Sequence, residues 1–273
     1  MIEIQNLKFK YASTKHCVFN DLSLTLGEGQ IIGLLGKNGT GKSTLLYLLC
    51  GLLRPAAGRV SVDGCEPTRR DAAFLQDIFL VPEEFELPQV SMKQLMAMYR
   101  SMYPRFSEQL FEECLSDFDM PKAVRLNSLS MGQKKKVYMS LALATNTRYL
   151  LMDEPTNGLD IPSKSLFRKV MAKCVTDDRT IVISTHQVHD VEQLIDQVVI
   201  IDNDSLLMNS SIPDLMDRYS FGVLPQGSTA EVIYSEPSLQ GYAAIWKRQE
   251  GEGETQPNME LLFNAVTQGK VKG

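Results

Sequence analysis

Residues 36–44 read GKNGTGKST, which is a glycine followed by four residues and then Gly-Lys-Ser. This spacing is typical of a loop that binds the phosphates of a nucleotide. An apolar run, residues 31–35, comes directly before the loop, and a helix-like run, residues 44–49, comes directly after it. The stretch therefore predicts a strand, a glycine turn and a helix in succession.

The residue types in this loop suit an anion. Glycines tolerate backbone conformations that a Cβ would penalise, so successive N–H groups can point inward, and the helix N-terminus adds partial positive charge. Lys42 can reach the β- and γ-phosphates, and the Ser43 hydroxyl can bind Mg²⁺. A chance match in a glycine-rich turn is disfavoured because the flanking strand and helix signals agree. We therefore expect a nucleoside triphosphate to contact Gly36, Asn38, Gly39, Thr40, Gly41, Lys42, Ser43 and Thr44.

The composition is that of a globular protein of 273 residues, with 44% hydrophobic and 22% charged residues. This length allows one large domain with an appendage. The net charge of −5, without a strongly basic segment, disfavours a nucleic-acid partner. The five cysteines show no paired spacing, which predicts reduced thiols that pack. No run reaches the ~18 apolar residues that span a bilayer, so a membrane function would need a span from another chain.

Apolar patterning predicts an α/β fold with two kinds of sheet. Alternation in residues 1–30, with a further strand at 59–64, predicts an antiparallel β layer. Unalternating apolar strands at 78–81, 149–152 and 180–183 predict a parallel core sheet that is covered on both faces.

Further segments interrupt or follow this core. Methionine, leucine and aromatic residues at helical spacing predict a helical subdomain inserted at about residues 86–140, with this stripe in the core rather than on a ligand surface. Residues 198–208 predict a β-hairpin, and residues 212–219 predict a short helix. We expect a domain boundary near residue 220 and a small α+β extension over residues 221–273. Its expected elements are strands at 231–234 and 243–246 and a helix at 260–265.

Two acidic residues follow the apolar run at 149–152. Asp153 at the strand tip suits Mg²⁺ binding through water, and Glu154 can orient and deprotonate the water that attacks a γ-phosphate. In isolation such a pair is often only a solvated turn. Open α/β sheets, however, place ligand sites at the carboxyl ends of their strands, where the phosphate loop would also lie. The combination favours the catalytic interpretation.

Further motifs carry a resemblance to a known family. Leu129-Ser130-Met131-Gly132-Gln133 is similar to the signature motif of ATP-binding cassette (ABC) proteins. Residues 155–160 resemble the D-loop of that family, and residues 184–186 resemble its switch-histidine motif. Tyr11 stands where the family places an aromatic ring that stacks on adenine. The resemblance covers about residues 1–215, with six motifs in order, and is therefore specific.

The resemblance implies a P-loop NTPase fold with a RecA-like parallel sheet core. It also implies a head-to-tail dimer in which each ATP lies between the phosphate loop of one subunit and the signature of the other. It assigns Ser130, Gly132, Gln133 and Asp160 to nucleotide binding, and His186 to catalysis at the γ-phosphate. The physical interpretation agrees, because N–H groups at the start of the helix from about Gly132 to Ala144 can bind an anion. Taken alone, residues 129–133 would indicate only a serine-capped helix start.

One position departs from the family pattern. The family usually has Gln at the end of the strand that enters the helical subdomain, whereas this chain has Glu83. A carboxylate can still bind Mg²⁺, so we count Glu83 with Ser43 and Asp153 as metal ligands, although it adds negative charge beside the phosphates. We give His16 and His189 no role.

The run Lys134-Lys135-Lys136 allows two interpretations. It is either a patch for an anionic surface or, as we expect, the solvated face of the helix that follows the signature. Basic residues also occur there in the family.

These features predict an Mg²⁺-dependent ATPase subunit of an ABC transporter, which drives a separate multi-pass permease from the cytoplasmic face of the cell membrane. Export is favoured over import because residues 221–273 resemble extensions of some exporter-type subunits. The alternative is a soluble ABC-type ATPase that acts as a mechanical clamp. A third alternative is a non-catalytic nucleotide sensor, which would need Glu154 to be inert. Nucleic acid is not an expected partner.

Overall fold

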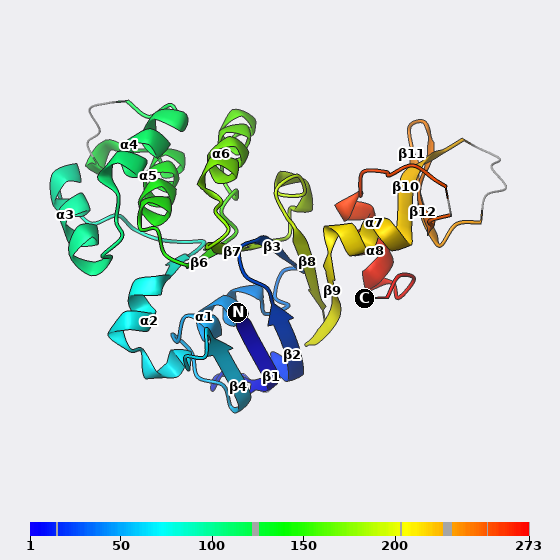
Figure 1. The fold of residues 1–273 in the computed structure, drawn as a ribbon, viewed down its shortest axis with the longest axis horizontal. Coiled ribbons are helices and arrows are strands. Elements are labelled where there is room, and N and C mark those ends of the chain that lie inside the picture. The colour runs from blue at the N-terminus through cyan, green and yellow to red at the C-terminus, as the bar shows by residue number, and fades with distance from the viewer. Residues whose placement is uncertain (15, 122–125, 203, 226–230, 250, 273) are drawn as a thin grey trace.

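A six-stranded sheet forms the centre of the computed structural model, which describes residues 1–14, 16–121, 126–202, 204–225, 231–249 and 251–272 (Figure 1). In spatial order its strands are β5 (Ile78–Val81), β6 (Tyr149–Asp153), β7 (Thr180–Thr185), β3 (Ile31–Leu35), β8 (Gln197–Asp202) and β9 (Ser205–Ser211). The first five are parallel, and β9 pairs antiparallel with β8. Every residue of β3, β6 and β7 is buried, which explains their unalternating apolar sequences. The predicted parallel core and hairpin are confirmed, although Asn203 in the hairpin lies outside the described residues.

A second sheet forms the predicted antiparallel β layer. Its order is β2 (Phe19–Leu26), β1 (Ile2–Phe9) and β4 (Ala57–Val62). The inward side chains of this layer share one apolar cluster with helix α1 (Lys42–Leu49) and with one face of the central sheet. Helix α1 therefore lies in a fixed place against both sheets, with its N-terminus at the carboxyl end of β3.

Helices cover the other face of the central sheet and extend beyond its edge. They are α3 (Met92–Met102), α4 (Glu108–Asp117), α5 (Met131–Ala144) and α6 (Ile161–Cys174), whereas α2 (Ala72–Asp77) packs its buried Phe74 into the apolar cluster of the antiparallel layer. The apolar stripe lies in the core as predicted at Leu95, Tyr99, Phe111 and Cys114, whereas Met102 is exposed. Helix α5 runs from this helical region into the main core, where its last residues are completely buried.

The C-terminal segment forms a third sheet and a helix. After α7 (Ile212–Arg218) come β10 (Tyr219–Leu224), β11 (Tyr234–Ser238), β12 (Gly241–Lys247) and α8 (Met259–Thr267), and the sheet order is β10-β12-β11. The predicted strand at 231–234 is wrong, because β11 begins only at Tyr234. A tight hairpin closes at Leu239 and Gln240 and sets the register with β12, and the apolar pair Val232-Ile233 lies before the strand.

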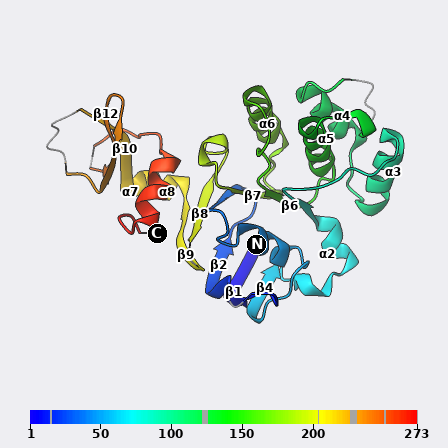
Figure 2. The same cartoon turned by 180° about the vertical axis from the view of Figure 1, so that it is seen from behind.

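The extension packs on the core rather than standing apart from it. Met259 and Leu262 of α8 belong to the same apolar cluster as Val198 of β8 and Met208 of β9. Figures 1 and 2 show α3 and α4 at one end of the molecule and the third sheet at the other, with the central sheet between them. The nucleotide motifs lie in this middle part.

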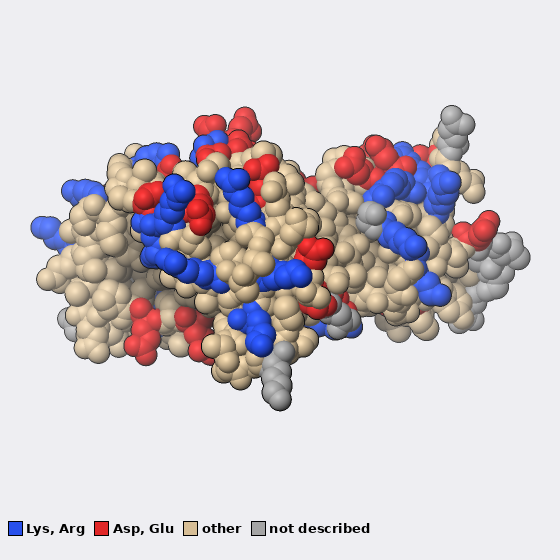
Figure 3. All heavy atoms as spheres, turned by 90° about the horizontal axis from the view of Figure 1, so that it is seen from below, with Lys and Arg blue, Asp and Glu red and all other residues tan. Residues whose placement is uncertain are grey.

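The surface carries charges of both signs. On the face seen in Figure 3, lysine and arginine side chains gather in groups over the core and over the extension, and each group is bordered by acidic side chains. None of the helices in the described ranges is long and apolar enough to cross a bilayer.

Candidate functional site

The phosphate loop takes a conformation that requires glycine at two positions. A Cβ at Gly36 would lie 2.7 Å from the carbonyl oxygen of Ile201. Gly41 has φ of +97°, and a Cβ there would lie 2.6 Å from Val18 Cγ1. Both contacts are too short for an L-residue, and the left-handed backbone adds strain. The sequence prediction that glycines shape this loop is confirmed.

Lys42 is buried at the start of α1. Its Nζ donates to the carbonyl oxygens of Gly36 at 2.9 Å and Lys37 at 3.2 Å, and it lies 3.6 Å from Glu154 Oε1. Burial lowers the pKa of Lys42, while the carboxylates of Glu154, Asp153 and Glu83 oppose this shift. The loop thus holds a lysine cation that can accept an anionic phosphate as a partner.

Glu154 is held by the residues that follow β7. Its carboxylate accepts hydrogen bonds from Thr185 Oγ1 at 3.0 Å and from the backbone N–H of His186 at 3.0 Å. The ring Nδ1 of His186 lies 2.9 Å from Glu154 Oε1. Glu154 also has φ of +45°, an uncommon conformation for a residue with a Cβ.

Asp153 is the last residue of β6, and its carboxylate accepts a hydrogen bond from Ser184 Oγ. The paired strands β6 and β7 therefore place Asp153 and Glu154 beside residues 184–186, the segment identified as the switch-histidine motif.

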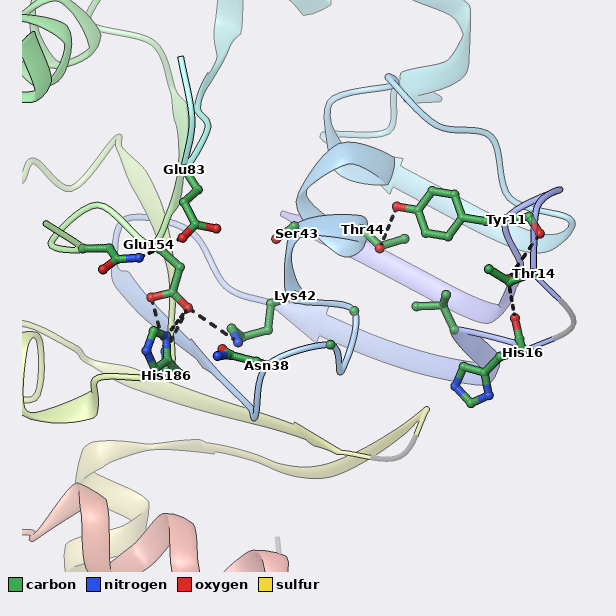
Figure 4. A pocket seen from close by; sticks show the side chains of 14 residues that line it. Tyr11, Thr14, His16, Asn38, Lys42, Ser43, Thr44, Glu83, Glu154 and His186 are labelled. Carbon is green, nitrogen blue, oxygen red and sulfur yellow. Dashed lines mark hydrogen bonds and ion pairs between the residues drawn. The ribbon is translucent and has the colours of Figure 1, made fainter. Parts of the chain in front are cut away.

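Lys42, Glu154 and His186 line one cavity of about 610 Å³, which we call the phosphate-loop cavity (Figure 4). Lys42, Glu154 and His186 lie on one side of it, and Tyr11 lies on the other. The Tyr11 hydroxyl is 3.0 Å from Thr44 Oγ1. The residues that line the phosphate-loop cavity are Tyr11, Thr14, His16, Val18, Asn38, Gly39, Gly41, Lys42, Ser43, Thr44, Glu83, Glu154, Asn157 and His186.

Glu83 faces this cavity from the segment after β5. Its Oε1 accepts a hydrogen bond of 2.8 Å from Asn157 Nδ2, so the acid that replaces the usual Gln is tied to the segment that resembles the D-loop. Glu83, Asp153 and the Ser43 hydroxyl provide oxygen donors, the type that Mg²⁺ prefers.

The signature residues lie apart from the phosphate-loop cavity. Ser130 caps α5: its Oγ accepts from Gln133 N at 3.3 Å, and Gln133 Oε1 accepts from Ser130 N at 3.0 Å. This capping box leaves the N–H groups of Met131 and Gly132 without intrahelical acceptors. Asp160 similarly caps α6, accepting from Ser163 N at 2.9 Å.

A second hollow of about 520 Å³ is lined by both helix starts, and we call it the signature hollow. Its lining residues are Ser130, Gly132, Gln133, Lys136, Gly158, Leu159, Asp160 and Ser163. The structure therefore divides the nucleotide-binding residues expected from the sequence into two sets, each with its own hollow.

Four residues beside these sites were not recognised in the sequence. Thr185 and Asn157 lie inside motifs that were identified, and only their side-chain roles were missed. His16 lines the phosphate-loop cavity although we gave it no role, and no local pattern signals it. His189, which also has no predicted role, is not one of the four, because it lines none of these hollows and is exposed next to Glu192.

Lys135 is the fourth, and here the sequence interpretation is wrong. It is only 4% exposed, so the three lysines do not form one solvated face. Its Nζ donates to the carbonyl oxygens of Glu154 and Asn157. The signal was present in the sequence, because Lys135 lies four residues before the buried Met139 and thus on the buried side of a helix.

Comparisons with known proteins agree with this geometry. A family model described as "ABC transporter" matches residues 19–157. The ABC transporter ATP-binding protein YtrB of Bacillus subtilis (strain 168) is 29% identical over 220 residues, which cover 80% of this chain and 75% of YtrB. The methionine import ATP-binding protein MetN of Carboxydothermus hydrogenoformans is 32% identical, covering 79% of this chain and 67% of MetN. The Nod factor export ATP-binding protein I of Bradyrhizobium diazoefficiens is 29% identical, covering 74% and 68% respectively.

A solved structure shows the same fold. The dimeric ATP-binding cassette MJ0796, described as a post-hydrolysis state bound to ADP and Pi, superimposes with a TM-score of 0.68. It is 22% identical in sequence, and the match covers 78% of this chain and 99% of that one. Because the family model spans about half of the chain and the ATP-binding relatives match most of it, this protein belongs to the ABC transporter family, as an ATP-binding subunit that hydrolyses ATP.

Proposed function

We propose that two such cassettes form a head-to-tail dimer, with each ATP held between the phosphate-loop cavity of one and the signature hollow of the other. The observation that carries this proposal is the division of the nucleotide residues into two separate hollows on one chain. Two helix starts line the signature hollow, and the Met131 and Gly132 N–H groups at the start of α5 suit a phosphate. The dimeric state of MJ0796, which has the same fold, also supports the proposal.

In the proposed mechanism, a triphosphate replaces Glu154 as the partner of Lys42. Lys42 Nζ now lies 3.6 Å from Glu154 Oε1, a separation that allows the lysine to exchange the carboxylate for a phosphate. Glu154 then takes a proton from the attacking water, as a general base. Thr185 and His186 keep its carboxylate in place through their hydrogen bonds. Tyr11 would support the adenine ring at the far side of the cavity.

We also propose that Ser43, Asp153 and Glu83 hold Mg²⁺, with Asp153 acting through water. In the described ranges no group of three or more His, Cys, Asp or Glu side chains could hold a metal by itself, so phosphate oxygens would complete the coordination. When bound, Mg²⁺ neutralises part of the phosphate charge.

At the level of the whole protein, we propose residues 1–220 as the nucleotide-binding domain and residues 221–273 as an extension. The domain would drive a separate multi-pass permease from the cytoplasmic face of the membrane. We propose export as the direction, supported by the resemblance of the extension to those of exporter-type subunits. The named relatives include both an import and an export subunit.

The experiment that tests this function is co-purification. The tagged chain is purified from detergent extracts of its native cells, and we expect a multi-pass membrane protein in stoichiometric amount. A second preparation, made without detergent, serves as the control and should lack that protein. A chain that stays without a partner in both preparations would contradict the transporter role and favour the soluble clamp.

A further inference from the structure

Lys135 lies on the second turn of α5, five residues after the capping Ser130, and it points into the protein. Its Nζ donates to the carbonyl oxygen of Asn157 at 2.7 Å and to that of Glu154 at 3.0 Å. Its partners are backbone carbonyls on one turn rather than carboxylate side chains. A lysine that binds in this way fixes the course of a backbone segment.

The segment that Lys135 holds carries the proposed general base. Glu154 has a left-handed φ of +45°, and Asn157 N donates back to the Glu154 carbonyl at 3.1 Å, closing the turn. Strained backbone of this kind persists only when the surrounding structure fixes it. Lys135 is part of that surrounding structure, because it binds the carbonyl of the same residue whose carboxylate faces the cavity.

Burying this lysine has an electrostatic cost that nearby acids reduce. Burial lowers the pKa of Lys135, and the carboxylates of Glu83, Glu154 and Asp153 oppose that shift. These three acids all belong to the proposed ATP and Mg²⁺ site. Lys135 also lines a hollow of about 600 Å³ together with Glu83, Gly132 and Asn157, so it lies between that site and the signature.

We propose that Lys135 is a positioning residue that ties the signature helix α5 to the Glu154 turn of the same chain and thereby couples the two ATP sites of the dimer. This inference rests on the proposed function, because it requires the signature of each chain to face the ATP of its partner. The start of α5 then serves one ATP, and the Glu154 turn serves the other. A shift of α5 when its signature meets a phosphate is passed through Lys135 to the neighbouring general base.

The test compares three variants with the wild type in steady-state phosphate release and in equilibrium binding of a fluorescent ATP analogue. Lys135→Met keeps an unbranched side chain but removes its N–H donors. We therefore expect kcat to fall on the order of 10- to 100-fold, the effect of a misplaced catalytic group. Nucleotide Kd should stay within about twofold, since the phosphate loop is untouched. We expect the Hill coefficient for ATP to exceed one in the wild type and to fall to one in Lys135→Met.

Two further variants separate positioning from packing. Lys135→Arg can still donate to both carbonyls, so it should keep most of kcat and of the cooperativity. Lys134→Met changes the neighbouring, partly exposed lysine and should leave all parameters unchanged. If Lys135→Met does not fold, Lys135→Gln replaces it, since an amide can donate to only part of the same acceptor set.

The outcomes discriminate clearly. Wild-type kcat and Hill coefficient in folded Lys135→Met or Lys135→Gln would overturn the inference. Equal loss of kcat and of thermal stability in Lys135→Arg and Lys135→Met would also overturn it, because that pattern indicates packing alone. Failure of the proposed function would appear elsewhere, as a wild-type protein that binds no membrane partner or forms no ATP-dependent dimer.

Discussion

The phosphate-loop cavity and the signature hollow differ in how their polar groups are satisfied. In the first, the buried Lys42 and Glu154 have partners within the chain, and Glu154 accepts hydrogen bonds from both Thr185 and His186. At the second, a Cβ added at Gly132 would meet no atom of the described residues within 4 Å, and the adjoining Met131 is 65% exposed.

This difference separates binding from turnover. In a single chain, Lys42 and Glu154, the proposed phosphate-binding cation and general base, are already held in place. The signature offers helix N–H groups beside Gly132, where an added Cβ would have open space among the described residues. We therefore expect nucleotide binding to be a property of one chain and hydrolysis to be a property of two, and each prediction below tests that division.

The largest effect is expected for Glu154→Gln. The amide cannot take a proton from water, so phosphate release should fall on the order of 100- to 10,000-fold. Nucleotide binding should persist, and with ATP present the variant should accumulate as a dimer in sedimentation experiments.

Lys42→Ala provides the contrast to that variant. It should lose affinity for the nucleotide itself, since it removes the cation that faces the phosphates. Unchanged phosphate release in Glu154→Gln would remove Glu154 as the base, and normal ATP affinity in Lys42→Ala would overturn the role of that lysine.

A pair of glycine substitutions compares the two regions directly. Gly41→Ala should destabilise the single chain, because left-handed backbone costs about 1–2 kcal/mol and the new Cβ collides with Val18 and Phe19. Gly132→Ala has open space and a helical backbone, so its melting temperature should be unchanged or slightly higher. It should nevertheless reduce turnover on the order of tenfold or more by standing between the N–H donors and a phosphate.

Thermal unfolding and phosphate release, measured on both variants, check this pair. A Gly132→Ala protein with full turnover would show that no phosphate approaches the signature. One with a much lower melting temperature would show that the hollow is packed within the chain after all.

The features that the sequence predicted correctly are those with local requirements. The Gly36–Thr44 loop is encoded by glycine spacing and its flanking runs, and Asp153 and Glu154 by the end of an apolar strand. Continuous apolar runs are enough to identify parallel strands, because both faces of each strand are buried.

The failures have tertiary causes. Three consecutive lysines predict solvent exposure from residue type alone. The backbone carbonyls that accept hydrogen bonds from the buried Lys135, however, come from a turn about twenty residues further along the chain. The register of β11 with β12 is set by the hairpin that closes at Leu239 and Gln240, and the apolar pair before the strand does not signal that hairpin. His16 enters the cavity only because the loop after β1 folds beside α1.

The smallest predicted effect concerns Glu83, which follows β5 and lines the phosphate-loop cavity. As a Mg²⁺ ligand with a full charge, it should bind the metal more tightly than the amide usual in the family. Glu83→Gln should therefore raise the Mg²⁺ concentration for half-maximal phosphate release by several-fold, while maximal turnover changes little. The hydrogen bond from Asn157 can persist, because an amide oxygen still accepts it.

The matched control is Glu84→Gln. Glu84 lines the hollow beside Lys135 and not the phosphate-loop cavity, so this change should leave the Mg²⁺ requirement unaltered. Equal Mg²⁺ titrations for Glu83→Gln and the wild type would exclude Glu83 from the metal site and leave it as the partner of Asn157 alone.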